Sequence, residues 1–162
     1  MDAITLLRDD HQKVRKLFRE YEGASEESPA TKRRIVDQIV EELTVHAFIE
    51  EQLFYPAVKH LQPEGVGEAP EDLVKEAEEE HAQVKLLLAE LETMGPEEEY
   101  FDAKVTVVID DVTHHAEEEE NEMFPKVRDA MGRNDLQDLG KRMLELKETA
   151  PRLPSQEAGT GS

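Results

Sequence analysis

The chain has 162 residues, enough for one domain with a substantial core, because roughly two thirds of the unfolded surface can be buried at this size. Its 19 basic and 39 acidic residues give a formal charge of -20, which repels phosphate backbones and anionic membrane surfaces, so we expect no nucleic-acid and no membrane partner. The lack of cysteine excludes disulfides, thiolate catalysis and sulfur-ligated metals, and fits a reducing compartment.

The N-terminal segment, MDAITLLRDDHQ, is acidic and amphipathic. It contains no unbroken apolar run of signal-peptide or membrane-span length. We therefore expect a cytoplasmic protein. We also expect it to be a monomer or a weak dimer.

Tracts rich in Glu, Leu, Ala and Lys predict helix along the whole chain, interrupted by Gly- and Pro-containing segments at residues 23–30, 62–70 and 94–96. The predicted long helices are 2–22, 31–61, 70–94 and 97–131. Short connectors leave too little chain for a crossover, which favours an up-down-up-down four-helix bundle.

A shorter amphipathic helix is predicted at 135–147, packed on the outside of the bundle. Residues 1–150 are therefore expected to form one all-α domain. The segment 151–162, PRLPSQEAGTGS, is expected to be a disordered tail because its composition is polar and rich in breakers.

The predicted buried faces carry one histidine on each long helix: His11, His46, His81 and His115. Glu50 and Glu119 follow two of these histidines by four residues and lie on the same apolar stripes. A buried carboxylate without a partner is costly, so two of them beside four imidazoles need a common explanation. A metal provides one, because His and Glu at positions i and i+4 lie about 6 Å apart on one helix face and can converge on one ion or on two adjacent ions.

The two His and Glu pairs lie in related segments, HAFIEEQLFYP from His46 and HAEEEENEMFP from His115. Pro56 and Pro125 close the two segments, and each removes a backbone N–H and crowds the carbonyl four residues earlier. We expect each helix to be bent or loosened just past its ligands. The alternatives are a simple kink and a kink that shapes the end of a buried pocket. Tyr55 faces away from the stripe on an ideal helix, but a loosened turn could swing it inward, which makes it a candidate ligand or proton donor.

Other polar residues of these helices are expected outside the site. Runs of acids on a bundle helix usually form a solvated face, and helical geometry directs five acids off the stripe: Glu51, Glu117, Glu118, Glu120 and Glu122. His60 lies about 21 Å along the axis from His46, which places it near the end of the bundle. His114 lies about 100° around the helix from His115 and flanks the core.

This pattern resembles hemerythrin-like proteins of the HHE cation-binding type, over a region from about Thr5 to Val127. The family signature is one histidine on helix 1, HxxxE on helix 2, one histidine on helix 3 and HxxxE on helix 4, which here corresponds to His11, His46 with Glu50, His81, and His115 with Glu119. The resemblance implies two iron ions with an oxo or hydroxo bridge, and with Glu50 and Glu119 as bridging carboxylates. It also implies that the histidines of helices 1 and 2 serve one iron and those of helices 3 and 4 the other.

The sequence departs from the oxygen-carrying hemerythrins, which have two histidines one turn apart on helix 3. Ala77 and Lys85 occupy the positions four residues before and after His81, so the site has four imidazoles rather than five. The resemblance then implies less saturated irons, which weakens the oxygen-carrier interpretation and favours redox chemistry. Residue types alone suit iron or manganese and leave zinc open.

The leading hypothesis is a non-haem di-iron protein that reacts with a small oxidant, hydrogen peroxide, oxygen or nitric oxide, in catalase- or peroxidase-like detoxification. The alternative is an oxygen- or iron-binding sensor or storage protein without turnover, whose fold depends on its metal. A purely structural bundle would leave six buried polar residues unexplained.

Overall fold

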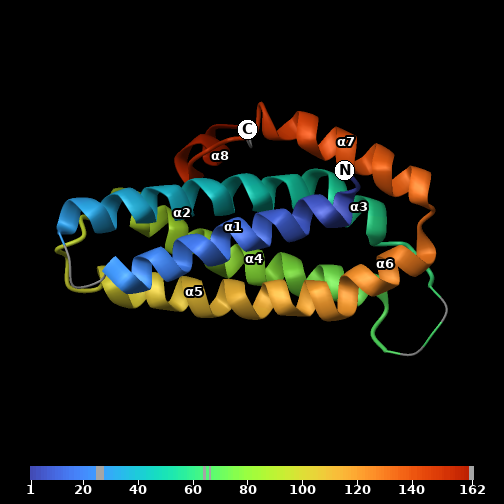
Figure 1. Ribbon diagram of the computed structural model, residues 1–162, viewed down its shortest axis with the longest axis horizontal. Coiled ribbons are helices and arrows are strands. Elements are labelled where there is room, and N and C mark those ends of the chain that lie inside the picture. Colours follow the sequence, from blue (N-terminus) through green and yellow to red (C-terminus); the bar gives the residue numbers. More distant parts are fainter. Residues whose placement is uncertain (25–27, 64, 66, 161–162) are drawn as a thin grey trace.

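The computed structural model describes residues 1–24, 28–63, 65 and 67–160, and the side chains of these residues up to 157. Four long helical segments lie side by side, and successive segments run in opposite directions (Figure 1). Their bounds are α1 Ala3–Ala24; α2 Pro29–Ile49 with η1 Glu50–Phe54 and α3 Tyr55–Val58; α4 Pro70–Thr93; and α5 Phe101–Glu118 with η2 Glu119–Met123 and α6 Phe124–Ala130. Within the described residues the regular structure is entirely helical, and none of these helices is long and apolar enough to cross a membrane.

The helix ends follow the local sequence. Ser28 caps α2, where its hydroxyl accepts a hydrogen bond from the Thr31 N–H and Pro29 occupies the first turn. Helix α5 begins at Phe101 rather than at the predicted residue 97, because residues 97–100 form turns after Pro96. The expected connectors at 23–30 and 62–70 fall partly on residues 25–27, 64 and 66, which lie outside the described part of the chain.

The loosened turns expected before the two prolines are present as π-helical segments, η1 and η2. The Tyr55 N–H donates to the Glu50 carbonyl and the Phe124 N–H donates to the Glu119 carbonyl, in each case five residues back. Because Pro56 and Pro125 cannot donate the next α-helical hydrogen bond, a wider turn is tolerated there. Each π turn begins at one of the two buried glutamates.

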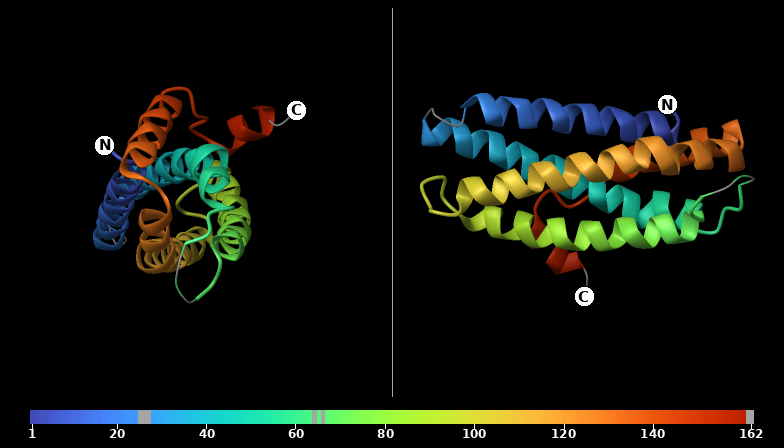
Figure 2. Two further views of the ribbon diagram at one scale, coloured as in Figure 1. Left: turned by 90° about the vertical axis from the view of Figure 1, so that its right-hand side faces the viewer. Right: turned by 90° about the horizontal axis from the view of Figure 1, so that it is seen from below.

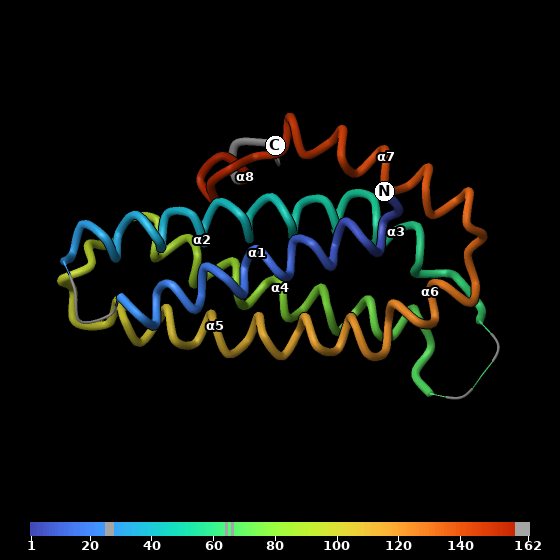
Figure 3. The backbone as a smooth tube through the Cα atoms, in the orientation of Figure 1, coloured from blue at the N-terminus to red at the C-terminus, as the bar shows by residue number. Residues whose placement is uncertain are grey.

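Two further helices follow the bundle. Helix α7 (Arg133–Lys147) packs across the outside of α1, and α8 (Pro154–Thr160) lies near α4 (Figures 1 and 2). The close approach of α7 requires Gly140, where an added Cβ would collide with the Met1 carbonyl oxygen. Figure 3 traces the chain from the end of α6 back over the bundle through α7.

The tail differs from the expectation of disorder after Pro151. Leu153 packs against the bundle core, and the Ser155 N–H donates to Glu92 Oε1 at 3.1 Å. The Arg152 N–H donates to the Gln156 side chain at 2.8 Å. Composition alone missed this segment because one apolar side chain and a few polar contacts hold it, while residues 161–162 lie outside the described residues.

The core is divided into two apolar clusters along the bundle axis. One contains residues near the π turns, including Leu7, Phe54, Val58, Phe124 and Val127. The other contains residues toward the opposite end, including Val14, Phe18, Ile39, Leu88 and Val108. The four buried histidines and the two buried glutamates occupy the layer between them.

Candidate metal centre

The structure brings all six predicted metal-binding residues together in the layer between the two core clusters. All are buried, and the two glutamates are the least exposed, at 0% for Glu50 and 1% for Glu119. Their ligand atoms form two groups, in each of which the atoms lie within 4.8 Å of one another: His11, His46 and Glu119, and Glu50, His81 and His115. The grouping matches the pairing of histidines that the family resemblance implies.

Each glutamate contacts a histidine from both halves of the bundle. The carboxylates therefore occupy positions from which they can bridge two adjacent ions. The nitrogen–oxygen distances are 3.1 Å for His46 Nε2 and 3.2 Å for His81 Nε2 to Glu50 Oε1, 3.1 Å for His11 Nε2 to Glu119 Oε1, and 3.5 Å for His115 Nε2 to Glu119 Oε2.

The opposite ring nitrogen of every one of these histidines contacts a further carboxylate. These pairs are His11 Nδ1 with Glu120 at 3.2 Å, His46 Nδ1 with Asp10 at 2.9 Å, His81 Nδ1 with Glu51 at 2.8 Å, and His115 Nδ1 with Glu80 at 2.9 Å. A carboxylate at Nδ1 fixes the ring orientation and the tautomer, and makes Nε2 a stronger metal ligand. All four imidazoles are therefore oriented as ligands usually are.

The expectation that Glu51 and Glu120 belong to a solvated face was wrong. Glu51 contacts His81 and Lys85, and Glu120 contacts His11 and forms a two-pronged ion pair with Arg15. Sequence reasoning also missed Asp10 and Glu80. The available signal was the doubled glutamate at the fifth and sixth places of both segments, and an acid directly before each histidine of α1 and α4.

The inner atoms of the site fit a bound cation. When the proton of each imidazole is on Nδ1, the Nε2 atom has a lone pair that faces a carboxylate oxygen. Two acceptors that face each other repel, so this arrangement is favourable only if a cation lies between them. His46 Nε2 and Glu50 Oε2 are buried and have no hydrogen-bond partner among the described residues, although the nitrogen lies 3.1 Å from Glu50 Oε1. The donor set of imidazoles and carboxylates suits iron or manganese.

The pKa values of the buried histidines and of Glu50 also indicate that the centre stabilises positive charge. Burial lowers the pKa of His46 and His115, but the nearby carboxylates outweigh it and raise the pKa of both well above the usual histidine value. Burial raises the pKa of Glu50, but the charge of His46 and several hydrogen bonds lower it well below its usual value. Protons and metal ions therefore compete for this centre.

Tyr55 is turned into the site, as expected for a loosened helix. The residue is 1% exposed, and its hydroxyl lies 2.8 Å from Glu119 Oε2 and 3.1 Å from Glu50 Oε1. The same oxygen lies 3.2 Å from His81 Nε2 and 3.3 Å from His115 Nε2. Burial, followed by the charges of the two glutamates, raises the pKa of the phenol well above its usual value, so the hydroxyl keeps its proton.

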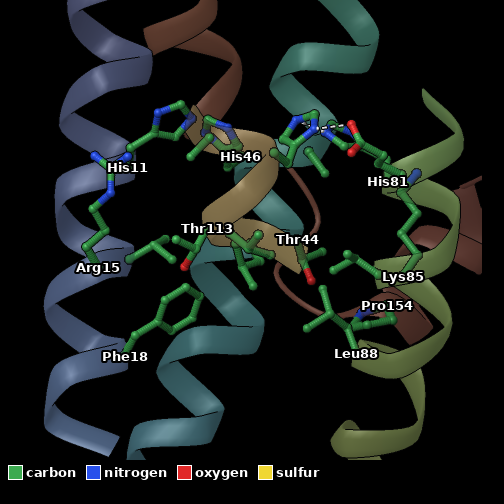
Figure 4. Close-up of a pocket in the computed structure, with 18 of the residues that line it drawn as sticks. His11, Arg15, Phe18, Thr44, His46, His81, Lys85, Leu88, Thr113 and Pro154 are labelled. Carbon is green, nitrogen blue, oxygen red and sulfur yellow. Dashed lines mark hydrogen bonds and ion pairs between the residues drawn. The ribbon is translucent and has the colours of Figure 1, made fainter. Parts of the chain in front are cut away.

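A small cavity of about 50 Å³ adjoins the four histidines on the side away from Tyr55. Figure 4 shows His11, His46 and His81 in a row above it, with Phe18 and Leu88 farther down. Its apolar lining comes from all four long helices and from the C-terminal segment: Val14, Phe18, Leu43, Val84, Leu88, Val112 and Pro154. A cavity needs a volume of about 10–15 Å³ to hold one water molecule, so this cavity admits only molecules of a few atoms.

The remaining histidines lie outside the centre. The His114 side chain is 66% exposed and pairs with Glu118 at 2.9 Å on the surface. His60 is exposed near the end of the bundle, beyond α3. Both positions agree with the expectation from helix geometry.

Replacing Glu51 by glutamine should lower metal affinity by about 10- to 100-fold, because the charged partner of His81 is lost while the ligand remains. The matched control is Glu78→Gln, an exposed acid on α4 that should leave the affinity unchanged. Competition with a chelator of known affinity measures the change. Equal affinities for both variants would contradict the assigned role of Glu51.

Comparison with known proteins identifies the family of the chain. A family model described as hemerythrin HHE cation binding domain matches residues 2–127. The crystal structure of a protein containing that domain, the Rv2633c homologue from Mycobacterium kansasii, is 26% identical, has a TM-score of 0.73, and aligns over 92% of this chain and 86% of its own.

A DNA nickase from Nostoc sp. is 27% identical over 99% of this chain but only 44% of its own length. The chain thus spans less than half of this curated relative. The family match covers most of the chain and includes all six buried ligand candidates. The chain belongs to the hemerythrin HHE cation-binding domain family.

Proposed function

We propose that the chain binds two iron ions, with an oxo or hydroxo bridge, and reacts with a small oxidant in catalase- or peroxidase-like detoxification. The observation that supports this most is the presence of two three-ligand groups with a glutamate that contacts histidines of both groups. A cavity large enough for a molecule of a few atoms adjoins them. Bound iron would supply the change of oxidation state by which one hydrogen peroxide is reduced to water while a second is oxidised to dioxygen, 2 H₂O₂ giving 2 H₂O and O₂.

The protein side chains have three tasks in this proposal. The carboxylates at the Nδ1 atoms hold the imidazoles in place, and Glu50 and Glu119 span the two halves of the centre. The Tyr55 hydroxyl keeps a proton between the two glutamates, in reach of both. It is therefore the candidate that exchanges a proton with the two glutamates during turnover.

The cavity favours a small oxidant over larger substrates. Its volume of about 50 Å³ excludes molecules with bulky substituents. Hydrogen peroxide, oxygen and nitric oxide all meet the size limit. The four-imidazole ligand set is the reason for preferring turnover over reversible oxygen carriage.

Oxygen evolution by the iron-loaded wild type on addition of hydrogen peroxide tests the proposal. Sustained evolution over many turnovers per chain supports the enzyme. A protein that takes up two irons and evolves no oxygen would instead fit the alternative, an oxygen- or iron-binding sensor or storage protein. A protein that takes up no iron would contradict both.

Restoring a fifth imidazole by Lys85→His should lower peroxide turnover, because the new ring would occupy a position otherwise open to the oxidant. Lys85 lines the cavity one turn after His81, whereas Ala77 is packed in the core cluster beside Met123, so Ala77→His would overpack that core. Lys85→Gln is the control for losing the ion pair with Glu51. Turnover is compared at equal iron content, and equal rates in all three proteins would refute this explanation of the open position.

DNA cleavage does not enter the proposal. The formal charge of -20 opposes binding to a phosphate backbone. The longest basic run is Lys32–Arg34, in which Lys32 pairs with Asp102 at 2.8 Å and Arg33 pairs with Asp37. The nickase of Nostoc sp. has more than half of its length outside the part that resembles this chain.

A further inference from the structure

The cavity beside the histidines contains a buried hydroxyl that the metal centre does not use. Thr44 lies on α2, is 3% exposed and lines the cavity. Its Oγ1 has no hydrogen-bond partner among the described residues. A hydroxyl left unpaired in the interior destabilises a fold, so a partner in the cavity would compensate for it.

Other threonines in helices or just after them show how unusual this is. The hydroxyls of Thr93 and Thr106, on helices, and of Thr149, in the turn after α7, donate to backbone carbonyls three or four residues earlier, at 3.2, 3.0 and 3.5 Å. This back-bonding is the ordinary solution for threonine within a helix. Thr44 has the same local option and does not take it, which leaves its hydroxyl available to the cavity.

The charged residues around the cavity are committed elsewhere. Arg15 pairs with Glu120 at 2.9 Å, and Glu80 accepts from His115 Nδ1. Lys85 pairs with Glu51 and Glu157. Among the described residues, Thr44 is therefore the cavity side chain whose polar group is both buried and unpaired, apart from Nε2 of His46, which faces the metal centre.

The position of Thr44 is repeated in the second half of the chain. Thr44 precedes His46 by two residues, and Thr113 precedes His115 by two residues. Both threonines line the cavity, as do the alanines that follow the two histidines, Ala47 and Ala116. Figure 4 shows Thr44 and Thr113 below the histidines and above Phe18 and Leu88.

We propose that the cavity is the binding site for the small oxidant, and that the Thr44 hydroxyl holds it by a hydrogen bond next to the metal centre. The ligand class is a molecule of two to four atoms that accepts a hydrogen bond, with hydrogen peroxide the best match, because it can both accept from and donate to a hydroxyl. The identity of the natural ligand, a small oxidant, rests on the proposed function. Whether the cavity binds small hydrogen-bond acceptors is tested separately.

Azide serves as the probe, since it is small, accepts hydrogen bonds and is not turned over as peroxide is. In the iron-loaded protein, Thr44→Val should weaken azide binding by about 10- to 100-fold, the value of one hydrogen bond to a charged acceptor, whereas Thr44→Ser should bind as the wild type does. Thr106→Val is the matched control on an exposed helix position and should have no effect. The KM for peroxide should rise in Thr44→Val with little change in kcat.

Thermal unfolding provides a readout that needs neither iron nor turnover. Replacing the unpaired hydroxyl by a methyl group of the same shape should raise the midpoint of the protein without iron by a few degrees in Thr44→Val. Thr44→Ala also lacks the hydroxyl. If the valine variant takes up less iron than the wild type, the azide affinity of Thr44→Ala is compared with that of the wild type instead. Equal azide affinity in wild type, Ala and Val variants would overturn the site.

The two proposals fail differently. Azide binding that depends on the Thr44 hydroxyl, without oxygen evolution by the wild type, would support the cavity site and reject the enzyme. Oxygen evolution that is equal in wild type and Thr44→Val at all peroxide concentrations would support the enzyme and reject the role of Thr44.

Discussion

Replacing either His46 or His115 by alanine should reduce the iron content well below two per chain and lower the thermal stability. Each variant removes one imidazole from a three-ligand group, and the fully buried Glu50 or Glu119 then loses one of the histidines that balance its charge. Losing one partner of a buried charged pair costs roughly 3–5 kcal/mol. In a chain of this size, that corresponds to a fall in the unfolding midpoint of about 10 °C.

His114→Ala is the matched control for this experiment. His114 adjoins His115 in sequence, yet its side chain is 66% exposed and pairs with a surface glutamate. Iron content and unfolding midpoint should remain those of the wild type. Full iron loading in both His46→Ala and His115→Ala would refute the assignment of the ligands.

Replacing Tyr55 by phenylalanine should reduce peroxide turnover by about 10²-fold while iron content changes little. The ring is retained, so packing beside Phe54 is kept, but the hydroxyl that contacts Glu50 and Glu119 is lost. A positioned proton donor typically contributes about 10²- to 10⁴-fold to a rate. The expected fall therefore appears in kcat, measured by oxygen evolution at equal iron content.

The control for this variant is Tyr100→Phe, at a tyrosine that is 65% exposed and lies just before α5. Its turnover should equal that of the wild type. If Tyr55→Phe also retained full turnover, proton delivery would have to be assigned to another group. If it lost its iron, the hydroxyl would belong to the ligand set rather than to proton transfer.

The six buried ligand candidates could be predicted because they obey the period of a single helix. Each histidine continues an apolar stripe, and each glutamate follows its histidine by one turn. The structure places all of them in one layer. Periodicity therefore identified the residues that face the bundle axis.

The acids at the Nδ1 atoms could not be found in this way. Asp10 and Glu80 directly precede the histidines of α1 and α4, and Glu51 and Glu120 directly follow the buried glutamates, so each lies about 100° away from the stripe. At that angle a side chain reaches the neighbouring helix and not its own. Asp10, for example, serves His46 on α2. The period of a single helix does not show which of its flanking acids reach a neighbouring helix.

The inward position of Tyr55 depends on a change from an α-helix to a π-helix. On an ideal α-helix it would lie on the opposite side from His46, but the π turn of η1 inserts one residue and rotates the next part of the helix by about 100°. Pro56 predicted a loosened turn, but it did not predict how far the helix would rotate there. The short helix α8 escaped prediction because its contacts are to distant residues, such as Glu92.

Metal analysis of protein purified in air, together with its ultraviolet and visible spectrum, tests the central claim most directly. The two ligand groups and the two glutamates that reach both of them predict two irons per chain and absorption bands from oxo-to-iron charge transfer. One zinc or manganese per chain, or a colourless protein that takes up no second ion when iron is added, would contradict a bridged di-iron centre.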